Sequence, residues 1–435
     1  MTDKAAPTPG IASPSADGVS AQTRTMLWIL LIVYIFNFLD RQIVNILAEP
    51  IKADLGLSDT QLGLLAGPAF AVFYALLGIP IARYADKDGT NRVRLIALAL
   101  TIWSAMTAVC GLAQNFVQLL FARIGVGVGE AGCTPAAHSL ISDSVAPEKR
   151  SSAIAFYGLG VPIGSLLGLI IGGIANDLYG WRVALMLVGA PGLLLALVVL
   201  FVMREPRHSR PVEAAAAPAR LSTGEAMREI FASRAFVYIL IASSVVAFLG
   251  YGKALWTISF FIRSHGLSTT EAGLSMAVVL GLAGVFGTWL GGKVADKFGP
   301  RDKKHILTLP AYGMALAAPV LFLGYHMDNW VVAVALLIVP TILNSAYYGP
   351  AYGCVQGLVR PQARAVAASI MLFGQNLIGL GFGPFLFGVL SDALAPTYGQ
   401  ESVRYVLYGA AWLGLIPAFF FWRASLRLGR ELKSG

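Results

Sequence analysis

Two stretches of the sequence share the five-position pattern Ala-Asp-Lys-x-Gly: ARYADKDGTNR at residues 82–92 and GKVADKFGPR at residues 292–301. Each stretch directly follows a long apolar run, and the two aspartates, Asp86 and Asp296, are 210 residues apart. A short basic loop with a turn glycine is common in membrane proteins. A match at five positions in equivalent places nevertheless favours an internal duplication, in which each half of the chain carries one copy of the loop.

The composition is that of an integral membrane protein. The chain has 435 residues, of which 57% are hydrophobic and 13% are charged, and its mean hydropathy is +0.70. A soluble globular chain is usually about 45–50% apolar and about 25% charged. The three cysteines, Cys110, Cys133 and Cys354, all fall in apolar runs without metal-like spacing, and we expect them to be buried.

Twelve apolar segments are long enough to cross a bilayer, which needs about 20 residues. They are continuous rather than alternating, which predicts helices and excludes a β-barrel. The expected spans are 26–48, 61–83, 93–113, 116–140, 151–175, 181–203, 235–262, 269–292, 304–325, 330–354, 364–391 and 402–424. The predicted fold is an all-α membrane protein of two pseudo-symmetric six-helix halves.

The distribution of basic residues predicts the orientation. With the N-terminus placed inside, 25 of the 32 lysines and arginines lie on the inner side, 4 lie on the outer side and 3 lie within spans. Such a bias is the topology signal of a multi-pass protein. The formal charge of +9 is therefore a membrane signal rather than a nucleic-acid signal. We expect a cell (inner) membrane location, with both termini cytoplasmic.

The spans divide the chain into five parts. We expect a disordered cytoplasmic tail (1–25), an N-terminal six-helix half (26–203), a cytoplasmic linker (204–234), a C-terminal six-helix half (235–424) and a short cytoplasmic tail (425–435). Within the linker, STGEAMREIF has a helical pattern that Ser222 or Thr223 can cap, which predicts a helix along the membrane surface.

Five ionisable acids and bases lie well within the spans: Asp40, Arg41, Arg123, Glu130 and Lys253. A charge at mid-membrane costs about 2.5–3.5 kcal/mol, so such residues should face the bundle interior and be paired or functional. At about 1.5 Å per residue, the three bases each lie roughly 6–7 Å outward of the centre of their spans. Asp40 lies in the same layer, and Glu130 lies two turns deeper than Arg123.

This arrangement predicts an anion site. Asp40 could be a structural counter-ion of Arg123 or Lys253, but three bases to one acid in the layer favour an anionic guest. Burial favours the neutral form of Glu130, which makes it the candidate proton carrier. Asp40, beside the bases, should stay ionised until an anion competes for them.

Buried amides and aromatic residues can complete the cavity, since buried polar groups need partners. The candidates are Asn37, Asn344, Tyr347 and Gln375. GVGEAG (127–132) fits a dinucleotide-binding pattern, but it lies inside a span with no preceding strand, so no nucleotide or other cofactor is expected.

The repeated loop resembles the signature of the major facilitator superfamily, roughly Gly-x-x-Ala-Asp-Arg-x-Gly-Arg, and the resemblance extends over residues 26–424. Residues 292–301 match well, whereas the first copy has Ala82 for glycine, Lys87 for arginine and two extra residues before Arg92. The resemblance implies that Asp86 and Asp296 hold the inner ends of the two halves together. Lys87 and Arg92 belong to the same gating loop.

A branch of that superfamily is also indicated. NFLDR (37–41), RIGVGVGEA (123–131) and PEKRSSAIAFYGLGVPIG (147–164) resemble spinster-like proteins, including bacterial homologues. That resemblance implies transport of lysolipids and sphingoid lipids such as sphingosine-1-phosphate. It further implies that Arg41 and Arg123 bind the anionic headgroup, and that Asp40 and Glu130 are the protonatable partners.

The leading hypothesis is a secondary active transporter of an amphipathic anion, such as a lysophospholipid or a sphingoid phosphate. It would act as a monomer by alternating access, with protons as the coupling ion. A proton-coupled symporter of small organic or sugar acids is the alternative. A membrane receptor or enzyme is a distant third, because no nucleophile–base pair, metal cluster or phosphate-binding loop is evident.

Overall fold

The computed structural model describes residues 20–87, 89–206 and 222–432. Most of the predicted N-terminal tail and much of the linker lie outside these ranges. All regular elements in the described residues are helices, which confirms the predicted all-α fold. Ten helical segments are long and apolar enough to cross a membrane.

Two of those ten segments are too long for a single crossing. Pro147–Val202 has 56 residues and Pro361–Glu431 has 71. Gly180, with φ 81°, and Gly399, with φ 57°, interrupt them in the left-handed region, where a glycine is favoured. Dividing both segments at these glycines gives twelve crossings in the described chain.

The first six crossings form the N-terminal half. Its elements are α1 (Ala21–Ile46), α2 (Ala48–Leu55), α3 (Asp59–Ala66), α4 (Pro68–Ala85), α5 (Arg92–Cys110), α6 (Phe116–Glu130), α7 (Cys133–Ser144), η1 (Pro147–Lys149), α8 (Arg150–Gly158) and α9 (Gly160–Val202). α1 begins at Ala21, earlier than expected, because the Ser20 hydroxyl caps its first turn by accepting from the Thr23 amide.

The second six crossings form the C-terminal half, preceded by the short helix α10 (Thr223–Ala232). Its elements are α11 (Arg234–His265), α12 (Thr269–Met276), η3 (Ala277–Leu282), α13 (Ala283–Phe298), α14 (His305–His326), α15 (Trp330–Ser345), α16 (Tyr348–Leu358), η4 (Pro361–Ala363), α17 (Arg364–Gly374), η5 (Gln375–Phe382), α18 (Gly383–Tyr398), η6 (Gly399–Glu401), α19 (Ser402–Leu413) and α20 (Leu415–Glu431). The segments η3 and η5 are π-helical.

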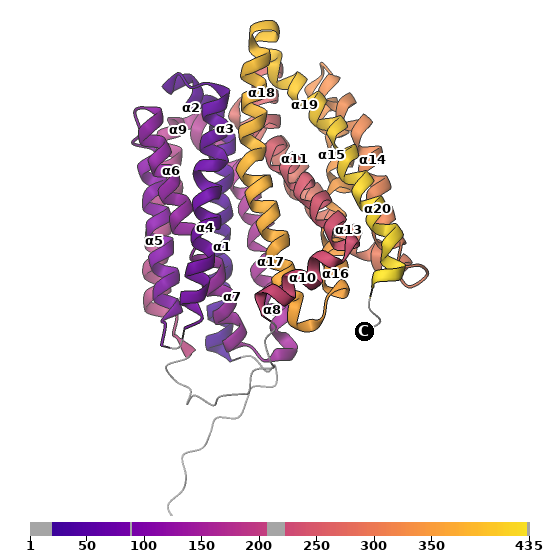
Figure 1. Cartoon of the computed structure of the whole chain (residues 1–435). Coiled ribbons are helices and arrows are strands. Elements are labelled where there is room, and N and C mark those ends of the chain that lie inside the picture. The colour runs from indigo at the N-terminus through magenta and orange to yellow at the C-terminus, as the bar shows by residue number, and fades with distance from the viewer. Residues whose placement is uncertain (1–19, 88, 207–221, 433–435) are drawn as a thin grey trace, which may run out of the picture.

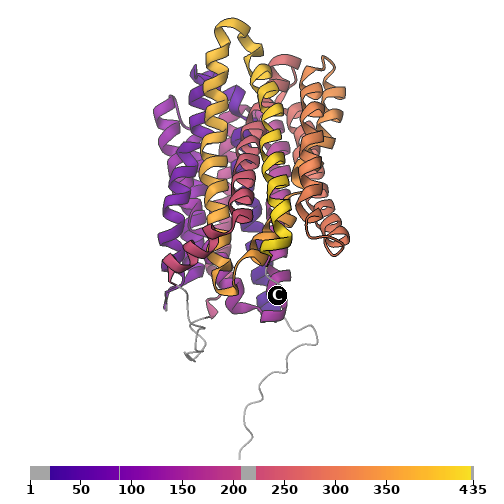
Figure 2. The ribbon, with the colours of Figure 1, turned by 45° about the vertical axis from the view of Figure 1, so that its right-hand side comes forward.

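The two halves stand side by side as separate bundles (Figures 1 and 2). We call the end of the molecule where α10 and the last turn of α20 lie the tail side, and the other end the opposite side. α10 lies across the foot of the C-terminal half, with Ala226 and Ile230 buried against it. Ser222 caps α10 in a capping box with Glu225, while Met227 and Phe231 are exposed.

Small residues let α9 approach α1 closely in the N-terminal half. Gly160, Gly164 and Gly168 repeat every four residues and so form one face of α9. A Cβ atom on Gly168 would lie 2.8 Å from the carbonyl oxygen of Leu39, and one on Gly164 would overlap the carbonyl oxygen of Ile35. The two helix backbones are therefore in contact, as small-residue interfaces in membranes allow.

We predict that Gly168→Leu separates α1 from α9 and destabilises the protein by about 1–3 kcal/mol, the usual cost of overpacking. Gly158→Leu is the matched control, since a Cβ atom at Gly158 meets nothing within 4 Å. Thermal unfolding of the purified protein in detergent measures both. Equal unfolding temperatures for the two variants would contradict close helix contact at Gly168.

Candidate functional site

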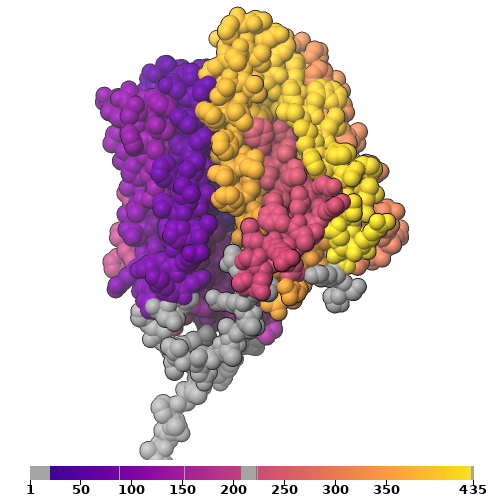
Figure 3. All heavy atoms as spheres, viewed as in Figure 1, coloured from indigo at the N-terminus to yellow at the C-terminus, as the bar shows by residue number. Residues whose placement is uncertain are grey.

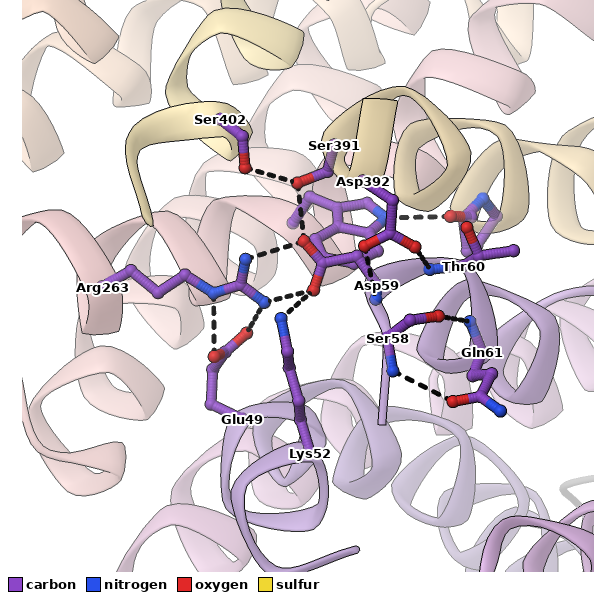
Figure 4. Close-up of polar contacts among 12 residues, drawn as sticks. Glu49, Lys52, Ser58, Asp59, Thr60, Gln61, Arg263, Ser391, Asp392 and Ser402 are labelled. Carbon is purple, nitrogen blue, oxygen red and sulfur yellow. Dashed lines mark hydrogen bonds and ion pairs between the residues drawn. The ribbon is translucent and has the colours of Figure 1, made fainter. Parts of the chain in front are cut away.

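A charged network joins the two halves on the opposite side (Figure 4). The guanidinium of Arg263, on α11, donates to both carboxylate oxygens of Glu49 on α2 at 2.7 and 2.8 Å. It also donates to both oxygens of Asp59, at the start of α3, at 2.6 and 2.8 Å. Arg263 is therefore held by the N-terminal half through two bidentate contacts, the strongest geometry available to arginine.

Two aspartates cap helices of the other half on the same side. Asp392, on α18, accepts from the backbone amides of Asp59 at 3.0 Å and Thr60 at 2.7 Å, and so caps α3. Asp177, on α9, accepts from the amide of Thr270 at 2.8 Å, and so caps α12. The Asp392 cap joins the end of the eleventh crossing (α18) to the start of the second (α3). The Asp177 cap joins the end of the fifth crossing (α9) to the start of the eighth (α12). The two caps are thus equivalent under the pseudo-symmetry of the halves.

The opposite side is consequently closed. A carboxylate at a helix N-terminus satisfies free amides and interacts favourably with the helix dipole. The two halves part toward the tail side, where the space-filling view shows a groove between the N-terminal half and the region of α10 (Figure 3).

The N-terminal half contains a buried ion pair. Arg41 Nε donates to Glu130 Oε2 at 2.8 Å, and Glu130 is fully buried. The Arg41 guanidinium also lies 4.7–5.0 Å from the ring centroids of Phe38, Phe70 and Tyr74, a cation–π arrangement. Arg41 and Glu130, both predicted site residues, are therefore partners of each other.

Asp40 differs from the expectation. Among the described residues its two buried carboxylate oxygens have no hydrogen-bond partner, and the expected ion pair with Arg123 or Lys253 is absent. Adjacent helix positions point about 100° apart, and Asp40 points toward Trp103 and Thr107 on α5. The structural alternative, an ion pair of Asp40 with Arg123 or Lys253, is therefore not formed among the described residues.

Arg123 and Asn37 are also buried in the N-terminal half. Arg123 Nε approaches the carbonyl oxygen of Leu65 at 3.4 Å, and its guanidinium lies 5.4 Å from the ring centroid of Phe70. The side-chain amide of Asn37 has no hydrogen-bond partner in the described part of the chain. Asn37, Asp40 and Glu130 thus form a cluster of buried polar groups in this half, and such groups are costly to bury unless they find partners or have a function.

A cavity of about 410 Å³ lies on the side of the C-terminal half. Four predicted site residues line it: Lys253, Asn344, Tyr347 and Gln375. Arg41, Arg123 and Asn37 do not. Lys253 is the one lysine, arginine, aspartate or glutamate in the cavity wall, and it forms no ion pair with any described carboxylate.

The predicted gating residues lie on the tail side. Asp86 accepts a hydrogen bond from the Ser139 hydroxyl at 3.1 Å, and Lys87 and Asp296 are exposed. Arg92 is fully buried: its backbone amide donates to Glu205 Oε2 at 2.7 Å and its guanidinium to Asp143 Oδ2 at 2.6 Å. These contacts all lie within the N-terminal half. They tie together the tail-side ends of α5, α7 and α9.

Sequence reasoning missed the residues of the opposite-side closure. Arg263, Glu49, Asp59, Asp392 and Asp177 all lie near span ends, where exposed charges are ordinary. One signal was available, since Arg263 is one of only four basic residues assigned to the outer side. Nothing in the sequence pairs it with carboxylates more than 200 residues away.

Family comparison agrees with this architecture. The family model described as Major Facilitator Superfamily matches residues 30–384. The chain therefore belongs to the major facilitator superfamily, whose members are multi-pass membrane transporters.

Three similar proteins narrow the class. An "MFS-type efflux pump" of Mycolicibacterium smegmatis is 33% identical over 93% of this chain and 93% of its own length. "Protein spinster homolog 1" of Xenopus tropicalis is 25% identical over 94% of this chain and 82% of its own. A crystal structure of a bacterial homologue of the human lysosomal transporter spinster, inward-facing and unoccupied, is 32% identical. It matches with a TM-score of 0.86 over 96% of this chain and 100% of that one. The chain is a transporter of the spinster type.

We predict that Asp392→Asn opens the opposite side more often, because it removes the charge that stabilises the start of α3. The reporter is Ala254→Cys, which lines the cavity, in a background where the three buried cysteines are replaced. Labelling from the opposite side by a membrane-impermeant maleimide should be about two- to fivefold faster, as expected for a loss of about 0.3–1 kcal/mol. Asp328→Asn is the matched control on the same side, because the Asp328 side chain is 99% exposed. Equal labelling rates in the two variants would show that Asp392 does not stabilise the closed opposite side.

Proposed function

We propose that the protein is a proton-coupled transporter of an amphipathic anion, a lysophospholipid or a sphingoid phosphate, working by alternating access. The observation that carries the proposal is the cavity wall, which contains one charged side chain, Lys253, amid residues that are mostly apolar or neutral. A guest with one anionic group and an apolar body is complementary to such a wall. The similarity to spinster proteins supports the same class of substrate.

We place the tail side in the cytoplasm and the protein in the inner membrane, because the sequence assigns 25 of its 32 basic residues to the inner side of the predicted topology. The closed opposite side is then external, and the cavity opens inward. A single chain contains both halves and the whole cavity, which supports a monomer as the working unit.

Competition for buried charges is the proposed coupling mechanism. Glu130 pairs with Arg41 at 2.8 Å. An anionic headgroup that draws Arg41 and Arg123 toward the cavity would leave Glu130 buried without its counter-ion, so that Glu130 would take up a proton. Asp40, already without an ion-pair partner among described residues, is the second proposed proton-binding group.

The tail-side loops are the proposed gate of the alternate state. Asp86 and Asp296 end long helices on the side that is parted here, and both are exposed. On closure of that side they would meet helix starts of the other half, as Asp392 and Asp177 do on the opposite side. Lys87 and Arg92 belong to the same proposed gate. Arg92 holds the end of the loop that carries Asp86, through its contacts with Glu205 and Asp143.

A symporter of sugar acids is the second candidate. The amides of Asn344 and Gln375 in the cavity wall could bind substrate hydroxyl groups, with Lys253 on the carboxylate. A "Hexuronate transporter" of Bacillus subtilis is 26% identical over 83% of this chain and 86% of its own length. The two candidates differ in whether an apolar chain contributes to affinity.

The proposed function predicts that proteoliposomes move a lysophospholipid faster under an imposed pH gradient than without one. Glu130→Gln should abolish the stimulation by the gradient, because a glutamine can neither release a proton nor pair with Arg41. Uptake and export of radiolabelled lysophosphatidic acid and of a hexuronate, measured in parallel, report substrate and direction. Undiminished gradient-driven transport by Glu130→Gln would refute the proton assignment.

Lys253→Gln should weaken binding of lysophosphatidic acid roughly tenfold or more, because a hydrogen bond to a charged group is worth about 1.5–3 kcal/mol. The matched control is Lys293→Gln on α13, a lysine that is exposed and does not line the cavity. Binding to the protein in nanodiscs at constant ionic strength measures both. Wild-type affinity in the Lys253 variant would place the headgroup elsewhere.

A further inference from the structure

The last helix of the C-terminal half carries a row of arginines at its tail-side end. Arg423, Arg427 and Arg430 are spaced by four and three residues on α20, so they follow one another along one side of the helix. That side lies opposite the one that contains the buried Phe421 and Leu428. The arginine row therefore faces away from the C-terminal half and toward the surroundings of the protein.

The arginine row has no ionic partner among the described residues, because no described carboxylate lies within ion-pair distance of any of its three members. The acidic residue next to the row, Glu431, is engaged elsewhere. Its Oε2 atom accepts from the Ser233 hydroxyl at 2.8 Å and from the Ala235 amide at 3.0 Å. These bonds hold the start of α11 against the last turn of α20, and they bring the exposed Arg234 beside the row.

The row lies at the depth of the membrane surface. Exposed apolar side chains continue along α20 as far as Trp422 and Leu426, which is 53% exposed, so the row overlaps the end of the lipid-facing surface. The Arg423 guanidinium lies 5.9 Å from the ring centroid of Tyr238 on α11 and 6.0 Å from that of Phe419. Arginines among tryptophan and tyrosine rings near a helix end are typical of the membrane interface.

We propose that the arginine row of α20, together with Arg234 of α11, binds the phosphate group of an anionic phospholipid in the leaflet on the tail side. A guanidinium donates to phosphate oxygens through a planar fork of N–H groups, a geometry that a lysine lacks. The lipid supplies the negative charge that no described carboxylate supplies, and its acyl chains lie along the exposed apolar side of α20. This lipid is a component of the bilayer rather than the transported guest, so the inference does not depend on which substrate the cavity takes.

A basic helix end alone is only a topology signal. Two further features of this end indicate a bound phosphate. Aromatic rings of two helices, α11 and α20, flank the guanidinium of Arg423. A second helix also contributes an arginine, Arg234, to the same place, so the charges converge instead of spreading along a loop. A lipid bound there would link the first and last crossings of the C-terminal half, and it should therefore stabilise the folded protein.

The experiment measures thermal unfolding of the purified full chain in a non-ionic detergent while dioleoylphosphatidylglycerol is added. Each basic residue near a charged headgroup contributes about a fivefold change in affinity. Arg423→Gln combined with Arg427→Gln should therefore raise the lipid concentration needed for half of the stabilisation by about tenfold or more. The matched control is Arg24→Gln combined with Arg94→Gln, which removes the same charge from two exposed arginines of the N-terminal half. The control should match the wild type.

Two single variants complete the test. Arg430→Gln, at the exposed end of α20, should weaken the effect of phosphatidylglycerol about fivefold, and it decides the question if the double variant does not fold. Lys253→Gln should respond to phosphatidylglycerol as the wild type does, because Lys253 belongs to the cavity. Dioleoylphosphatidylcholine and inorganic phosphate, added at the same concentrations, should stabilise the wild type much less than phosphatidylglycerol.

Four results would overturn the inference. Phosphatidylcholine could stabilise the wild type as well as phosphatidylglycerol does, which would remove the role of charge. Inorganic phosphate could be equally effective, which would indicate a site for the free ion. The control could lose as much as the α20 variants, which would indicate a general charge effect. Lys253→Gln could lose the response while the α20 variants keep it, which would place the lipid in the cavity. None of these results would count against the proposed function, which the transport assays test.

Discussion

The guanidinium of Arg263, held between the carboxylates of Glu49 and Asp59, decides which side of the molecule is closed. Its side chain is 8% exposed, and that of Asp59 only 3%. Lys52 also pairs with Asp59 within the N-terminal half, but only Arg263 reaches these carboxylates from the C-terminal half. Because Arg263 belongs to the C-terminal half and both carboxylates belong to the N-terminal half, the cost of breaking the pairs is a cost of separating the halves. The closed opposite side and the parted tail side occur together in this conformation.

Polar caps complement the ion pairs and orient the halves. Asp392 and Asp177 each satisfy free amides at the start of a helix in the other half, which neither half can do alone. Glycine contacts bring the backbones together at the same places: a Cβ atom on Gly388 would overlap the carbonyl oxygen of Asp59, and one on Gly173 would meet that of Thr269. Close approach and capping therefore occur together at both symmetric positions.

The sequence predicts the helices well, but it predicts poorly which side chains contact one another. Apolar runs of about 20 residues determine a membrane helix locally, so the all-α fold could be read directly. The intramembrane charges Arg41, Arg123, Glu130 and Asp40 were recognisable because each is costly where it lies. That Arg41 binds Glu130 while Asp40 points toward Trp103 depends on helix rotation, which tertiary packing sets. The cavity on the side of the C-terminal half is lined by many helices that lie far apart in the chain, so no local sequence pattern reveals it.

The two halves have equivalent helix arrangements, but they bury different side chains, and α1 contacts both regions. The N-terminal half encloses the Arg41–Glu130 ion pair, whereas the cavity on the side of the C-terminal half has Lys253 as the one lysine or arginine among its described lining residues. α1 faces both regions: Arg41 on it binds Glu130, and Gln42, the next residue, lines the cavity. Consecutive side chains on a helix diverge by about 100°, so neighbouring positions of one helix reach the buried ion pair and the cavity wall.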